Sequence, residues 1–89
     1  MSSDLKSVQS VLVDFVVDRS LVFSGKKEEL PLDVSLIETG ILDSYEMVEL
    51  IQFMEVTWKI HFERADLTRE KMGSLHKLSQ LVLSKLAGV

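Results

Sequence analysis

The pair in this sequence best placed to do chemistry is a serine directly after an aspartate, Asp43 and Ser44 in the stretch GILDSYEMVEL. Asp43 is a favoured residue for capping the start of a helix, and Glu46 follows three residues later, as in a capping box. Ser44 would then be the first helical residue, where free backbone N–H groups and the helix dipole favour negative charge. This position suits a hydroxyl that carries a phosphate ester. Because no activating base is close in sequence, we expect Ser44 to be modified by another enzyme rather than to act as a nucleophile.

Other reactive side chains are sparse. There is no cysteine, and the two histidines, His61 and His76, lack the spacing of a metal-binding motif, so we expect no metal site. No nucleophile with an oriented base and no metal-activated water is indicated, so we do not expect an enzyme.

The stretch after Ser44 is acidic without compensating bases. Acids occur at Asp43, Glu46, Glu49 and Glu55, and no Lys or Arg lies between positions 43 and 58. An acidic face of this kind can be an ordinary solvated surface. Its one-sided charge favours a docking surface for basic partners, because such charges speed encounter and select partners.

Three further side chains near the serine could contribute to a site. Tyr45 falls off the apolar stripe expected for this helix, so it should be largely exposed and available as a partner contact. Met47 and Met54 could line a cavity, since methionine adapts to irregular space, although methionines at helical spacing can equally be plain core.

Helical periodicity predicts the elements that hold these residues. Apolar residues at spacings of three and four predict a helix over residues 4–19, which Ser2, Ser3 or Asp4 could cap. A long loop over 20–42 follows, and a helix over 44–58 has its apolar stripe at Val48, Ile51, Met54 and Trp58, with Met47 and Leu50 at its flanks. A short turn near 64–70 precedes a last helix that begins after Ser74. The loop should be pinned onto the helices by Leu32, Leu36, Ile37 and Leu42.

These elements predict an all-α fold, a small four-helix bundle of three long helices and one short helix. The 89 residues are expected to form a single domain, 1–89, with enough apolar residues (46%) to fold. The formal net charge of -4 argues against nucleic-acid binding. No signal peptide and no membrane-spanning run is apparent, so we expect a cytoplasmic monomer without membrane insertion.

The order of features in this chain resembles the acyl carrier protein family. The long loop, the Asp-Ser pair, VELI at 48–51, ME at 54–55, the aromatic Trp58 and the last amphipathic helix fall in the expected order. The resemblance covers nearly the whole chain.

Two departures from the usual pattern of that family indicate which of its members the chain resembles more. Fatty-acid carriers usually read Gly-x-Asp-Ser-Leu, whereas here Ile41 and Leu42 separate Gly40 from Asp43, and Tyr45 stands where Leu is common. The longer spacing is closer to D-alanyl carrier proteins and other stand-alone specialised carriers.

The resemblance implies a function for each of these residues. Ser44 would carry 4'-phosphopantetheine, whose thiol holds an acyl or aminoacyl group as a thioester, and Asp43 would assist the attachment. Glu46, Glu49 and Glu55 would lie along the partner-facing side of the helix. The implied partners are a phosphopantetheinyl transferase, an acyl- or aminoacyl-activating ligase, and acyltransferase or condensing enzymes. The cargo and the pathway stay open, and the alternative is an unmodified helical interaction module that binds through its acidic helix.

Overall fold

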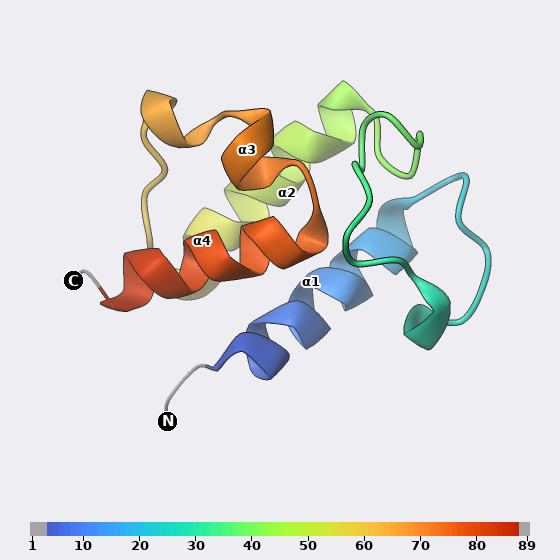
Figure 1. Ribbon diagram of the computed structural model, residues 1–89, viewed down its shortest axis with the longest axis horizontal. Coiled ribbons are helices and arrows are strands. Elements are labelled where there is room, and N and C mark those ends of the chain that lie inside the picture. Colours follow the sequence, from blue (N-terminus) through green and yellow to red (C-terminus); the bar gives the residue numbers. More distant parts are fainter. Residues whose placement is uncertain (1–3, 88–89) are drawn as a thin grey trace.

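The computed structural model describes residues 4–87 and, within them, every side chain except that of Arg69. The described chain contains four α-helices: α1 (Leu5–Arg19), α2 (Ser44–Trp58), α3 (Arg69–Met72) and α4 (Leu75–Ala87). Two single-turn 3₁₀ helices, Lys27–Glu29 and Arg64–Asp66, lie in the connections. In Figure 1, α1 and α4 lie side by side, α2 passes behind them, and the short α3 sits above α4. The predicted all-α architecture of three long helices and one short helix is confirmed.

Helix α1 begins where the sequence predicts. The Asp4 side chain accepts a hydrogen bond of 2.8 Å from the backbone N–H of Ser7, which satisfies one of the free donors at the helix start. Val8, Leu12 and Val16 recur every four residues and are completely or almost completely buried, so one face of α1 forms core. The other two candidate caps, Ser2 and Ser3, lie outside the described residues.

Helix α2 also has the predicted limits and the predicted capping box. The N–H of Glu46 donates to Asp43 Oδ1 over 2.8 Å, and the N–H of Asp43 donates to Glu46 Oε1 over 2.9 Å. The helix ends at Trp58 because Lys59 adopts a left-handed conformation with φ 53°, which turns the chain out of the helix.

The predicted apolar stripe of α2 is wrong at one position. Leu50 and Met54 are completely buried and Ile51 is half-buried, whereas Val48 is 51% exposed. The core face therefore passes through Leu50 rather than Val48. Most residues between positions 47 and 54 are apolar, so periodicity alone left the phase open, and packing against the rest of the bundle decides it.

The long connection between α1 and α2 belongs to the core rather than to the surface. Leu36 and Leu42 are completely buried and Leu32 is half-buried, which confirms these three predicted anchors. Ile37 is 45% exposed, so its prediction as an anchor is wrong. The backbone helps to hold the loop in place, since the N–H of Leu36 donates to the carbonyl of Gly73 over 3.0 Å.

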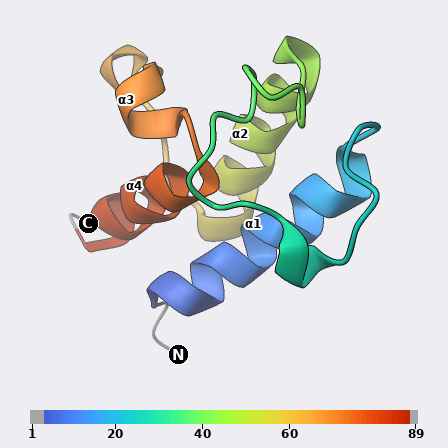
Figure 2. The same cartoon turned by 45° about the vertical axis from the view of Figure 1, so that its right-hand side comes forward.

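One apolar cluster joins all these elements. Figure 2 shows the loop crossing in front of the space between α1, α2 and α4, where it covers the core. Trp58, part of the predicted apolar stripe, is half-buried at the edge of this cluster and meets Phe53 edge-on, with ring centroids 6.4 Å apart. Phe53 in turn packs on Phe15 of α1 at 4.6 Å. Among the helices of residues 4–87, none combines the length and apolar character that crossing a bilayer requires.

Candidate functional site

The turn before α2 fixes the position at which Asp43 and Ser44 emerge. Gly40 has a φ of 78°, a left-handed conformation that glycine adopts without strain. After it, Ile41 and Leu42 enter the core, and the N–H of Leu42 donates to the carbonyl of Leu36 over 3.1 Å. The buried side chains of Ile41 and Leu42 therefore anchor the start of α2 to the core. The chain reaches the surface again at Asp43.

Ser44 is exposed and is the first residue of α2. The first turn of a helix has several N–H groups without helical acceptors, and the Asp43 carboxylate occupies one of them, that of Glu46. The remaining donors and the helix dipole favour an anionic group at this end. The hydroxyl of Ser44 is thus both accessible and close to a positive helix end.

Within residues 4–87, no side-chain base is hydrogen-bonded to the Ser44 hydroxyl. His61 lies beyond the other end of α2, roughly 22 Å away by the rise of a 15-residue helix. The ring of His76 is 3.4 Å from the amide nitrogen of Gln9 on α1. The surroundings of Ser44 therefore offer an accessible hydroxyl but no hydrogen-bonded general base for it.

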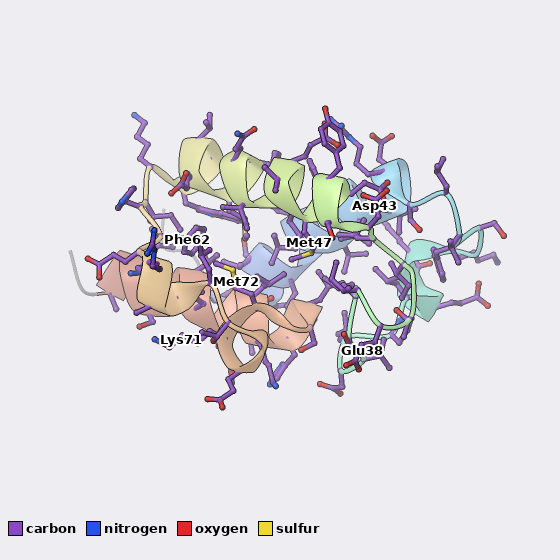
Figure 3. The ribbon with its side chains drawn as sticks, turned by 90° about the horizontal axis from the view of Figure 1, so that it is seen from above. Glu38, Asp43, Met47, Phe62, Lys71 and Met72 are labelled. Carbon is purple, nitrogen blue, oxygen red and sulfur yellow. The ribbon has the colours of Figure 1, made fainter. Side chains whose placement is uncertain are left out.

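A pocket of about 280 Å³ opens directly beside Ser44. Its walls come from the end of the loop, from α2, and from the chain around α3: Ser35, Ile37, Ser44, Met47, Ile51, Leu67, Thr68, Met72 and Gly73. Figure 3 shows Met47 on α2 and Met72 on α3 in the space between the two helices, with Asp43 at the start of α2. Most of the lining side chains are apolar, so the pocket suits an apolar group.

The two methionines predicted to line a cavity differ. Met47 is half-buried and lines the pocket beside Ser44. Met54 is completely buried in the core and does not line this pocket. The difference follows from the phase of α2, because Met54 faces the centre of the bundle together with Leu50.

The acids of α2 make contacts within the protein and do not form one row. Glu46 closes the capping box, while Glu49 pairs with Arg19 of α1 over 3.1 Å. The carboxylate of Glu55 accepts a hydrogen bond of 2.9 Å from the backbone N–H of Phe62. Nine residues at about 100° each place Glu46 and Glu55 on opposite sides of the helix. The expectation that these acids share one side of α2 is therefore wrong, and their role in partner binding stays a prediction.

The solvent face of α2 is partly apolar instead. Tyr45, Val48 and Val56 are 72%, 51% and 79% exposed, and their spacing places them on one side of the helix. The exposure predicted for Tyr45 is confirmed. Val48 and Val56 were not predicted as surface residues, although a stripe read from Tyr45 at steps of three and four would have included Val48.

A buried carboxylate on the side of α3 away from the pocket was also not predicted from the sequence. Asp66 is 6% exposed, and its carboxylate is 2.6 Å from the Lys85 ammonium of α4. The hydrogen bond from Lys85 and that from the backbone N–H of Glu63 lower the pKa of Asp66 to about 2, against the opposing effect of burial. No sequence signal links residues this far apart. Within the described residues, no three His, Cys, Asp or Glu side chains gather as a metal site.

Comparison of the chain with models of protein families gave no match. A search of curated protein sequences also gave no relative. A function can therefore be inferred only from the residues and their geometry.

Proposed function

We propose that this chain is a carrier protein that holds an acyl or aminoacyl group as a thioester on a 4'-phosphopantetheine arm attached to Ser44. The observation that supports this most directly is the exposed Ser44 hydroxyl at the first position of α2, next to an apolar pocket. The order of sequence features around Ser44, which resembles acyl carrier proteins, supports the same proposal.

Both ends of the phosphopantetheine arm are compatible with the surroundings of Ser44. Its phosphodiester would be negatively charged and would lie at the N-terminal end of α2, where N–H groups and the helix dipole favour an anion. The thiol of the arm supplies the reactive group, so the protein itself needs no activated nucleophile. An apolar part of the cargo would find Met47 and Ile51 in the pocket beside the serine.

Partner enzymes would do the chemistry on this carrier. A phosphopantetheinyl transferase would attach the arm, with the exposed carboxylate of Asp43 assisting next to Ser44. An acyl- or aminoacyl-activating ligase would load the thiol, and an acyltransferase or condensing enzyme would receive the cargo. Tyr45, Glu46, Glu49 and Glu55 are the proposed partner contacts.

A second candidate is an unmodified helical interaction module. The apolar stripe of Tyr45, Val48 and Val56 on the solvent face of α2 favours it, because exposed apolar residues on one helix face suit a groove on a partner. This module would need no group on Ser44. Modification of Ser44 therefore separates the two functions.

The deciding experiment is intact mass spectrometry after co-expression with a promiscuous phosphopantetheinyl transferase. We expect one phosphopantetheine adduct, located at Ser44 by peptide fragmentation and absent in Ser44→Ala. Ser35 lines the same pocket, so Ser35→Ala is the matched control and should keep the adduct. A folded protein that stays unmodified would reject the carrier in favour of the interaction module. An adduct at another serine would reject Ser44 as the attachment site.

A further inference from the structure

The wall of the pocket that faces α2 has little stability of its own. It consists of Leu67, Thr68, Met72 and Gly73. Helix α3 contributes a single turn of four residues, which is too short to persist without tertiary contacts. Leu67 is 51% exposed, so it anchors the wall weakly, whereas Met72 is buried. The contacts that hold this wall in place are therefore those of Met72 with the core and those of the residues at the edges of the wall.

Asp66 is such an edge residue, since it directly precedes Leu67. Its carboxylate has three donors: Lys85 Nζ at 2.6 Å, the backbone N–H of Glu63 at 2.8 Å and Lys71 Nζ at 3.5 Å. Lys85 belongs to α4, and Lys71 belongs to α3, directly before Met72 in the sequence. One carboxylate thus ties both the start of the wall and α3 to the long helix α4.

The chain around Asp66 transmits this attachment to the pocket. The N–H of Thr68 donates to the carbonyl of Asp66 over 2.9 Å, and the N–H of Met72 donates to the carbonyl of Thr68 over 2.8 Å. Because a buried carboxylate is costly unless all its oxygens are paired, Asp66 has few alternative positions. A displacement of the wall would pull Asp66 away from Lys85.

We propose that Asp66, held by Lys85 and Lys71, is a positioning residue that keeps the wall from Leu67 to Gly73 closed over cargo carried from Ser44. The inference rests on the proposed function for the cargo and on the geometry alone for the wall. The polar cluster between α3 and α4 consists of Asp66, Lys71 and Lys85. In this proposal the cluster has a role in the apolar pocket on the other side of α3.

The first test follows the wall without any cargo. Methyl-labelled methionine gives separate NMR signals for Met47 and Met72 at the pocket and for Met54 in the core. A soluble paramagnetic agent reports how accessible each methyl group is. In the double variant Asp66→Asn with Lys85→Gln, which removes both charges of the 2.6 Å ion pair and leaves the half-exposed Lys71 ammonium to water, we expect relaxation of the Met72 methyl group to rise about twofold or more. Met54 should not change.

Two further variants separate positioning from general loosening. Lys85→Arg keeps a cation within reach of the Asp66 carboxylate and should keep Met72 shielded. Lys77→Gln removes an exposed lysine of the same helix, leaves the three donors of Asp66 in place, and should behave as wild type. Equal accessibility of Met72 in the double variant and wild type would overturn the proposal. So would a parallel rise at Met54, because that would show loss of the whole core.

The second test adds the cargo. With a promiscuous transferase and butyryl-coenzyme A, the Ser44 oxygen would bond to the phosphorus of the butyryl-phosphopantetheine half, the pyrophosphate P–O bond would break, and adenosine 3',5'-bisphosphate would leave. Hydroxylamine would then cleave the thioester: its nitrogen bonds to the acyl carbon, the C–S bond breaks, and the sulfur takes up the proton that the nitrogen loses and leaves as the thiol. We expect the double variant to release butyryl about threefold faster than wild type and Lys77→Gln, because its wall opens more often.

The outcomes of the two tests are distinguishable. Equal release rates alongside an opened Met72 would overturn the shielding of cargo by the wall. If Ser44 cannot be loaded in any of these proteins, the proposed function and the cargo part of this inference are both rejected. The Met72 comparison would then still decide whether Asp66 positions the wall.

Discussion

The ionisation of Asp66 has a consequence for stability that can be measured. The hydrogen bond from Lys85, followed by that from the N–H of Glu63, lowers the pKa of this carboxyl to about 2 in the folded chain. In the unfolded chain the pKa returns to the ordinary value near 3.8. The folded state therefore holds this proton more weakly than the unfolded state. The stability that Asp66 contributes is fully present above about pH 4 and is lost as the pH falls toward 2.

Asp66→Asn is the substitution that tests this contribution. At neutral pH we expect the free energy of unfolding to fall by about 1.5–3 kcal/mol, the usual worth of hydrogen bonds to a charged group. The difference from wild type should stay constant down to about pH 4 and narrow between about pH 4 and pH 2. Urea denaturation at several pH values measures it. Other carboxylates titrate in the same range, so only the difference between the two proteins is diagnostic.

A difference that stays the same at the lowest pH would contradict the assignment. It would mean that the effect of Asp66→Asn comes from packing rather than from the charge that Lys85 stabilises.

The sequence predicts the residues of the Ser44 junction because they act locally. Asp43, Ser44 and Glu46 lie within four positions, and a capping box depends only on that spacing. The pairing of Asp66 with Lys85 depends instead on how two helices meet in space, and no local rule brings a residue of α4 to one before α3. The capping box of Asp43 and Glu46 could therefore be predicted from the sequence, whereas the ion pair of Asp66 and Lys85 could not.

At the scale of elements, α2 shows which information a helical pattern carries. Both ends of the helix were predicted, and the capping box of Asp43 and Glu46 marks its start in the sequence, but its rotation was wrong at Val48. The run from Met47 to Met54 is mostly apolar, so two rotations satisfy the pattern. The observed rotation buries Leu50 and leaves Tyr45, Val48 and Val56 as an exposed apolar stripe.

This stripe leads to a prediction about Tyr45. Because its side chain is 72% exposed, Tyr45→Ala should change the free energy of unfolding by no more than about 0.5 kcal/mol. Because it adjoins Ser44, it should lie in the interface with a transferase, and its removal should slow attachment of phosphopantetheine about tenfold. Rates come from time courses of intact mass, and stability from urea denaturation.

The matched control for this prediction is Val56→Ala. Val56 lies on the same face but three helical turns further on, roughly 16 Å from Tyr45, and should leave the attachment rate unchanged. If Tyr45→Ala is also unchanged, Tyr45 is an ordinary surface aromatic. If the two variants slow attachment equally, the stripe acts as a whole and the emphasis on Tyr45 is wrong.

At the scale of the whole molecule, the long loop completes the bundle. A chain of 89 residues has few elements with which to cover its core, and here the loop contributes Leu30, Leu36, Ile41 and Leu42 to it. The N–H of Leu36 in the loop donates a hydrogen bond to the carbonyl of Gly73, between α3 and α4. The carbonyl of Leu32 in the loop accepts one from the N–H of His76 in the first turn of α4. The same loop thus supports the start of α2 and one wall of the pocket beside Ser44.

Neighbouring residues of the loop should therefore differ sharply in their effect on stability. Leu36 is completely buried, so Leu36→Ala should lower the free energy of unfolding by about 2–5 kcal/mol, as for a leucine in a helical core. Ile37 is 45% exposed at the pocket, so Ile37→Ala should cost about 1 kcal/mol or less. Urea denaturation of both variants, followed by circular dichroism, makes the comparison.

If the loop were a detachable surface segment, Leu36→Ala would cost no more than Ile37→Ala and the helices would unfold at the same urea concentration as in wild type. A large loss at Leu36 alone would instead show that the loop unfolds together with the helices, as its place in the core requires.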